Sequence, residues 1–219
     1  MNLSILKTSI IACVLAIFVS NTFAQDFEGK IVFGIEYKKL PQEGMESMLP
    51  KESVTYVKNH LSRVETDAIM GMKTVIISNS KSNMATTLMD MLGQKYAIET
   101  NTKEEAEKNK TVDNAKVTIT DETKMVAGYN CKKAIIETEE GKFIVWFTKD
   151  FKYSSDQAKQ GALAKIDGTP LDFEMNQQGM VMRLYAKEIT KGAVSDLKFE
   201  IPADYKKTTP EELKKAFGM

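Results

Sequence analysis

The sequence is poor in the residues that most often carry catalysis or bind metals. Among 219 residues it has one histidine, His60, and two cysteines, Cys13 and Cys131. A thiol nucleophile usually needs a histidine base beside it, and zinc sites need three or four ligands at matched spacing. No HExxH, CxxC, GxSxG or phosphate-binding loop occurs. We therefore expect no enzymatic activity, no catalytic residues, no metal site and no cofactor.

Neither sign of charge is in excess. The 30 basic residues balance the 30 acidic ones, and residues 1–24 hold one lysine and no acid, so the remainder carries a net charge of −1. Proteins that bind nucleic acid carry a clustered basic surplus, so we expect no nucleic-acid partner. Long apolar runs are also absent after the N-terminus, so we expect no transmembrane segment.

The first 24 residues have the pattern of a secretory signal peptide. Lys7 gives the positive start, an apolar run covers residues 10–19, and small residues end the segment at Ala24. Ile11-Ala12-Cys13 weakly resembles a lipoprotein cleavage site, but the apolar run continues past the cysteine, which disfavours lipidation there. We therefore expect an exported protein of the periplasm or the extracellular medium.

After removal of the signal, Cys131 has no cysteine to pair with. The exported protein is thus expected to fold without an internal disulfide, and its length is that of one domain with a sizeable core. We expect a single monomeric domain over residues 25–219. Cys131 lies in the stretch GYNCKKA, and strand alternation leaves only Lys133 on its side. We expect Cys131 to be a small buried residue of a central strand that a thiol reagent does not reach.

The dominant hydrophobic period is two, which predicts strands. Short turns join most of them, and short connections require antiparallel neighbours, so we expect one large sheet that curls as its twist accumulates. The expected strands cover residues 27–38, 53–59, 61–67, 73–79, 84–91, 94–100, 116–122, 130–139, 142–149, 171–176, 180–190 and 197–201. The strand at 142–149 is apolar on both faces and needs a cover on both.

Helical patterns are few. Ser154 and Gln157 form a capping box before an apolar stripe that ends near Gly168, and a second box at residues 209–212 opens a helix that ends at Gly218. Residues 41–50 hold one turn, and residues 101–115 form an exposed helical turn or loop. The expected fold is mainly β with a few helices (α+β). It is a large curled antiparallel sheet, or half-barrel, with helices across the concave face.

Methionine is the one residue in excess, with 13 in the chain. Three pairs have the form M-x-M, a spacing that puts both thioethers on one face of a strand. Methionine is a flexible apolar residue that suits a cavity for varied hydrophobic ligands, whereas thioether sulfur also selects Cu(I). The near absence of histidine favours a cavity lining. The candidate lining residues are Met70, Met72, Met89, Met91, Trp146, Met180 and Met182.

Several stretches resemble a known family. They are VAGYNCKKAIIETEEGKFIVWFTKD, the opening FEGKIVFGIEY and the ending FEIPADYKKTTPEEL. The chain resembles an uncharacterised domain-of-unknown-function family of exported bacterial envelope proteins, which is similar in fold to the lipoprotein carrier LolA and the mycobacterial lipoprotein LppX. The resemblance implies an open half-barrel closed by helices around an apolar cavity. In such carriers the cavity shields acyl chains.

Three functions follow from these patterns. The first is an exported, non-catalytic envelope protein that binds a hydrophobic ligand such as a lipid, an acylated peptide or a lipoprotein. The second is a methionine-based Cu(I) binding protein. The third is a structural or interaction module with no small ligand. An apolar cavity would favour the first function over the third.

Overall fold

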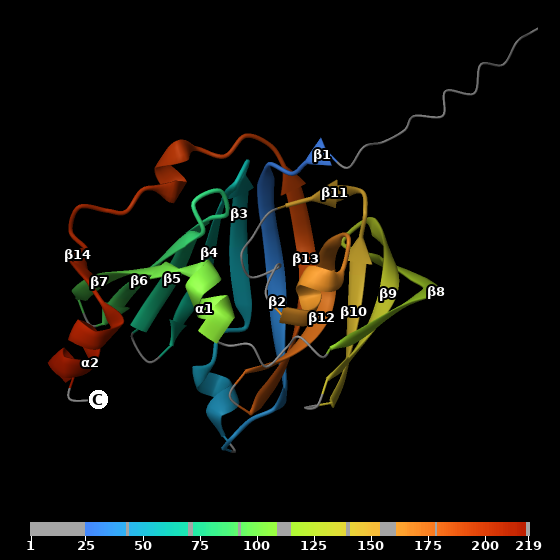
Figure 1. Ribbon diagram of the computed structural model, residues 1–219, viewed down its shortest axis with the longest axis horizontal. Coiled ribbons are helices and arrows are strands. Elements are labelled where there is room, and N and C mark those ends of the chain that lie inside the picture. The colour runs from blue at the N-terminus through green and yellow to red at the C-terminus, as the bar shows by residue number, and fades with distance from the viewer. Residues whose placement is uncertain are drawn as a thin grey trace, which may run out of the picture.

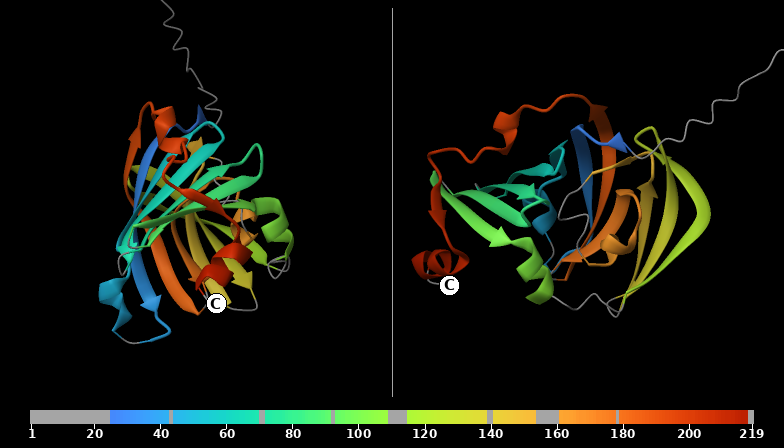
Figure 2. Two further views of the ribbon diagram at one scale, coloured as in Figure 1. Left: turned by 90° about the vertical axis from the view of Figure 1, so that its left-hand side faces the viewer. Right: turned by 45° about the horizontal axis from the view of Figure 1, so that its top comes forward.

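Most of the chain lies in one large curled sheet (Figure 1). The computed structural model describes residues 25–42, 44–69, 72–91, 93–108, 115–138, 141–153, 161–177 and 179–217. The expected signal peptide at residues 1–24 lies outside this part of the chain. Figure 2 shows the sheet from two further sides and makes its open, trough-like curl visible.

The alternating segments form strands close to the expected bounds, because their side chains divide cleanly between two faces. The main sheet contains β2 (Gly29–Lys39), β3 (Glu52–Lys58), β4 (Leu61–Ile69), β5 (Met72–Asn79), β6 (Met84–Met91), β7 (Gln94–Asn101), β8 (Lys116–Val126), β9 (Tyr129–Thr138), β10 (Gly141–Thr148), β12 (Thr169–Gln177), β13 (Met180–Lys191) and β14 (Lys206–Thr208). A separate pair consists of β1 (Gln25–Asp26) and β11 (Phe151–Lys152).

Two meanders make up the sheet. The first runs from β2 through β7 in sequence order, and the second runs from β8 through β9, β10 and β12 to β13. The second meander ends with β13 beside β2, so the strand order is β14-β7-β6-β5-β4-β3-β2-β13-β12-β10-β9-β8. Strands that are far apart in sequence, β2 and β13, therefore pair along most of their length in the middle of the sheet.

The expectation of purely antiparallel pairing is wrong at two places. β14 pairs with β7 in parallel, and β1 pairs with β11 in parallel. Both pairs are two or three residues long and join segments far apart in the chain. A parallel pair needs a long connection, and these two have one, whereas the hairpins do not.

The register assigns each side chain to one of two faces. We call the face that carries Ile31, Phe33 and Ile35 of β2 the first face, and the face that carries Lys30 and Val32 the second face. Two buried clusters lie on different faces. On the first face, Ala134, Ile136, Val145 and Phe147 pack with Ala162 and Ile166. On the second face, the C-terminal segment (Phe199, Ile201, Tyr205) packs on Val75, Ile77, Leu88 and Ala97.

Short helices connect or follow the strands. They are η1 (Met45–Met48), α1 (Thr102–Lys108), η2 (Gly161–Lys165), η3 (Asp196–Phe199) and α2 (Pro210–Phe217). The capping box before α2 forms as expected, because the Glu212 amide donates to Thr209 Oγ1 at 3.1 Å and the Thr209 amide donates to Glu212 Oε2 at 3.1 Å. No helix among the described residues is long and apolar enough to cross a membrane.

Two expected elements differ from the structure. The alternation at residues 197–201 predicts a strand, but they form η3 and an extended tail that packs on the second face through Phe199 and Ile201. An extended segment that packs on a sheet with one side only also has alternating apolar residues, so the pattern did not distinguish this tail from a strand. The helix expected at 154–168 is described only from residue 161, where a 3-10 turn packs on the first face.

The strand at 142–149 is not covered equally on its two faces. Val145 and Phe147 are buried under η2, as their side of the strand required. Ile144 on the other side is exposed, so the expected second cover is absent there. Trp146 is half-buried, and lysine side chains rather than a helix lie over its ring.

Candidate functional site

Five of the predicted methionines share the first face. Met72 lies directly opposite Met91, and Met89 lies on the same face two residues before it. Met182 lies opposite both Tyr37 of β2 and Met175 of β12. The five predicted residues, Met72, Met89, Met91, Met180 and Met182, are all half-buried, as is Met175, which the M-x-M pattern did not include. Met70 lies outside the described residues.

These methionines also lie at one end of the sheet. Met72 follows the turn between β4 and β5, Met91 precedes the turn between β6 and β7, and Met180 follows the turn between β12 and β13. In antiparallel meanders alternate turns fall at the same end. The connection from β2 to β3, with η1 and its Met45 and Met48, is at this end too. We call the methionines of the first face at this end the methionine rim.

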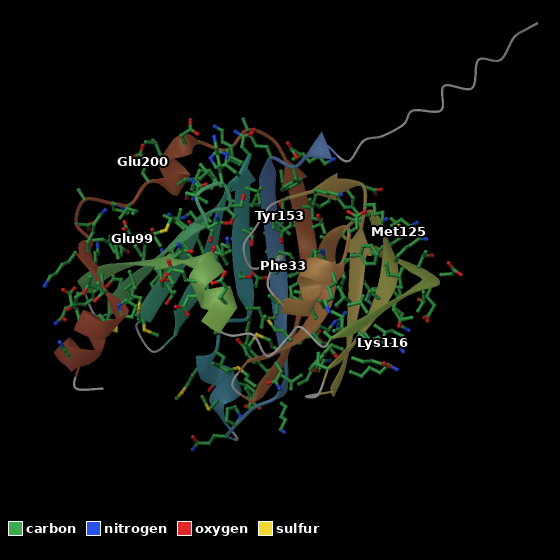
Figure 3. All side chains as sticks on the ribbon, in the orientation of Figure 1. Phe33, Glu99, Lys116, Met125, Tyr153 and Glu200 are labelled. Atoms are coloured by element: carbon green, nitrogen blue, oxygen red, sulfur yellow. The ribbon has the colours of Figure 1, made fainter. Side chains whose placement is uncertain are left out.

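Apolar side chains of β2, β12 and β13 lie on the first face next to Met175 and Met182. Phe33 packs edge-on against Phe173, with ring centroids 6.3 Å apart. Ile35 lies opposite Leu184 across the β2–β13 pair, and both are half-buried. Figure 3 shows Phe33 and Tyr153 near the centre of the molecule. On β3 and β4, between the two groups of methionines, the first face carries the buried Ser53, Thr55 and Ser62, so the apolar surface there consists of two separate patches.

Trp146 does not join this group. It alternates with Val145 and Phe147, so it lies on the second face, and its ring is close to Lys124 Nζ at 4.5 Å and Lys133 Nζ at 5.8 Å. The register therefore places Trp146 on the other face from the methionines, although it also packs against the buried cluster that contains Ile31 and Phe33. Stacking against ammonium groups provides a different reason for a half-buried tryptophan there.

A chain of ion pairs crosses the second face beside Trp146. Asp172 accepts hydrogen bonds from Arg183 Nε and Nη2, both at 2.7 Å, and also from Lys124. Arg183 Nη1 donates to Glu36 at 3.0 Å. Burial alone would raise the pKa of Asp172, but these hydrogen bonds outweigh burial and hold its pKa below the ordinary value. The sequence patterns assign no role to Arg183, whose partners Asp172 and Glu36 come from β12 and β2.

A notch opens where β3 stops short of β2. β3 begins at Glu52, opposite Gly34, while β2 continues to Lys39, and the Ile35 amide donates to the Lys51 carbonyl at 2.8 Å. Beyond that bond, an opening of about 630 Å³ is lined by Ile35, Tyr37, Glu46, Lys51, Glu52, Tyr185 and Lys187. Ile35 and Tyr37 belong to the first face, whereas Glu52 and Tyr185 lie opposite Gly34 on the second. The notch therefore connects the two faces at the methionine rim.

The aromatic walls of the notch are fixed in place. The Tyr37 hydroxyl donates to the Pro50 carbonyl at 2.9 Å. Tyr185 lies across Gly34, where a Cβ atom would come within 2.5 Å of the tyrosine ring, so only glycine leaves room for it. The guanidinium carbon of Arg183 is 5.0 Å from the centroid of the Tyr185 ring. Glu52 forms an ion pair with Lys187 on the same wall.

The residues with catalytic potential do not form a site. His60 lies in the turn between β3 and β4, whereas Cys131 lies in β9. Cys131 is fully buried, as expected, but β9 is the last but one strand of the sheet and not a central one. In the described part of the chain, no group of three or more histidine, cysteine, aspartate or glutamate side chains is placed to hold a metal ion.

We expect Cys131 to resist thiol reagents in the native protein. Burial raises the pKa of its thiol to about 11, so little thiolate exists at neutral pH, and the side chain is inaccessible. Ellman's reagent at pH 8 should label the native protein at least about a hundredfold more slowly than the urea-unfolded protein. A Lys132→Cys variant in a Cys131→Ala background supplies an exposed control. Labelling of native Cys131 as fast as this control would contradict the prediction.

Solved structures show a likeness in fold. The chain matches PNGF-II with a TM-score of 0.53 and 16% identity over 87% of its own length, but it spans only about a third (33%) of the PNGF-II chain. An uncharacterised conserved protein from Thermus thermophilus gives a TM-score of 0.48 at 12% identity, with 83% of this chain and 91% of that one covered. LprF from Mycobacterium bovis gives 0.36 at 10% identity, with 82% and 90% covered.

No curated protein matches the sequence. A family described as a domain of unknown function, DUF4412, matches residues 42–205. This range includes the methionine rim, most of the notch and most of the strands that carry them, from η1 to the extended tail after η3. The match covers well over half of the chain, and the protein therefore belongs to the DUF4412 family.

Proposed function

We propose that this protein is an exported, non-catalytic envelope protein that binds a hydrophobic ligand on the first face of its sheet. The ligand class is a lipid, an acylated peptide or a lipoprotein. The observation that supports the proposal most is the gathering of five half-buried methionines on one face and at one end of the sheet. In this proposal the first face lines the hollow of the curled sheet, and helices close over it.

The apolar surface suits this role. Partly exposed methionine, phenylalanine, isoleucine and leucine side chains lose contact with water when an acyl chain covers them, which contributes about 25 cal/mol per Å². Methionine has three rotatable bonds and adapts to chains of different shape. The signal-peptide pattern of residues 1–24 is the sequence feature that favours export. Export fits this role, because a carrier of acyl chains is needed where lipid must cross an aqueous compartment.

We expect polar substitutions at the methionine rim to weaken acyl binding. In residues 25–219, the double variant Met89→Gln/Met182→Gln should bind a fluorescent fatty acid roughly tenfold more weakly, because two apolar contacts are lost. The matched control is Met84→Gln/Met125→Gln, which alters two exposed methionines. Fluorescence titration measures both affinities. Equal affinities in the two variants, or no probe binding by the unaltered protein, would sink the proposal.

A second candidate is Cu(I) binding by thioethers. It is favoured by two cross-strand methionine pairs, Met72 with Met91 and Met175 with Met182. Leucine keeps the apolar character and removes the sulfur, so Met72→Leu/Met91→Leu separates the two candidates. Loss of Cu(I) with retained acyl binding would show that the rim has a metal function. If neither ligand binds the unaltered protein, the third function, an interaction module without a small ligand, is left.

A further inference from the structure

Four charged side chains line the notch beside β2, and two of them have no ion-pair partner among the described residues. Glu52 and Lys187 form an ion pair in its wall. Glu46 of η1 and Lys51, by contrast, line the same opening without an ion-pair partner in the described part of the chain. Both side chains are exposed to solvent at the opening, so a carboxylate and an ammonium group are available there to a ligand.

Such an arrangement selects for a ligand that carries both charges. A simple anion would satisfy Lys51 but would be repelled by Glu46, and a simple cation would meet the reverse situation. A zwitterion with its two charges a few bonds apart satisfies both side chains. The tyrosine rings of Tyr37 and Tyr185 add apolar walls for the atoms between the charges.

The position of the notch connects it to the methionine rim. Tyr37 lies directly opposite Met182, and Ile35 lies opposite Leu184. The helix that supplies Glu46 also carries Met45 and Met48. An amphiphile with its acyl chain on the first face would therefore place its polar headgroup in the notch, which is lined by residues of both faces.

We propose that the notch is a headgroup site for a zwitterionic phospholipid of the ethanolamine type. Lys51 binds the phosphate, Glu46 binds the ammonium group, and Tyr37 and Tyr185 contact the carbons between them. The proposal rests on the proposed function for its acyl part and names the class of lipid that the site prefers. Charge-assisted hydrogen bonds are stronger than those between neutral groups.

The test compares lipids that share acyl chains and differ in the headgroup. Calorimetric titration of residues 25–219 with dihexanoyl phosphatidylethanolamine and dihexanoyl phosphatidylglycerol should show a preference of roughly tenfold for the ethanolamine lipid. Glu46→Gln or Lys51→Gln should abolish this preference and leave the affinity for the fluorescent fatty acid unchanged. Glu104→Gln and Lys132→Gln, which alter exposed charges outside the notch, should keep the preference.

Water-soluble glycerophosphoethanolamine separates the two proposals, because it has the headgroup and no acyl chain. If the fatty acid binds but the two lipids bind equally, the headgroup site is refuted and the acyl site stands. If glycerophosphoethanolamine binds and the fatty acid does not, the acyl function is refuted and the notch stands. Competition by inorganic phosphate as strong as that by glycerophosphoethanolamine would reveal a simple anion site and overturn the assignment. Binding of neither compound overturns both.

Discussion

Replacement of Asp172 with alanine is expected to lower the free energy of unfolding by about 3 kcal/mol. The Asp172 side chain is only 6% exposed, and its carboxylate lies between Arg183 and Lys124. Removal of this carboxylate leaves two cations that face each other with no shared anion. Both cations are about a third exposed to solvent, which places the loss at the lower end of the range for breaking a buried ion pair.

A matched control exists in the same protein. Asp167 also accepts contacts from two lysines, Lys152 at 2.6 Å and Lys149 at 3.5 Å, but its side chain is 67% exposed. Asp167→Ala should leave the urea midpoint at pH 7 unchanged, because exposed ion pairs contribute little. Similar midpoints for Asp172→Ala and Asp167→Ala would show that the buried chain of ion pairs does not stabilise the sheet.

The same carboxylate predicts a dependence on pH. The hydrogen bonds from Arg183 and Lys124 hold the pKa of Asp172 in the folded protein below its value of about 3.9 in the unfolded chain. Its contribution is therefore fully present above the unfolded pKa and is lost as the pH falls through the folded pKa. The stability difference between the unaltered protein and Asp172→Asn should be constant from about pH 5 to pH 8 and shrink below about pH 4.

Most strands could be predicted because alternation is a local property. Residues 84–91 form a strand with the expected bounds, and the alternation at residues 27–38 predicts a strand where β2 covers Gly29–Lys39. The place of β13 beside β2 could not be predicted, since no local pattern records which distant strand a segment will join. The ion pair of Arg183 with Glu36 was missed for the same reason, whereas the pair with Asp172 lies across the β12–β13 hairpin and does not depend on that placement.

The methionine rim was only half predicted, although a further signal was present. The M-x-M spacing showed that each pair shares a face, but not that the pairs share one face and one end. Met72, Met91 and Met180 each adjoin a hairpin turn, and Gly93 and Gly179 mark two of these turns with positive φ angles. The connection from β4 to β5 and the one from β6 to β7 are two strands apart, which places them at the same end of a meander. Counting the strands between the connections could therefore have predicted that these methionines lie at the same end of the sheet.

Replacement of Phe147 with alanine should cost about 4 kcal/mol of stability, the largest effect that we expect from a single substitution. Phe147 is 1% exposed and packs on the first face with Val145 and with Ala162 and Ile166 from the η2 segment. A Cβ atom on Gly168 would come within 2.4 Å of its ring, so the fit around it is tight. The space left by alanine could not be refilled without moving η2.

Phe143→Ala is the matched control for this substitution, because Phe143 lies on the same strand and face as Phe147 but is only half-buried. Its loss should be about 1–2 kcal/mol in urea unfolding. Tryptic cleavage after Lys165, whose ammonium group donates to the Ala115 carbonyl at 2.8 Å, reports on η2 separately. Cleavage there should be faster in Phe147→Ala than in Phe143→Ala under native conditions. Equal cleavage rates would mean that Phe147 stabilises the sheet itself and does not hold η2 on the first face.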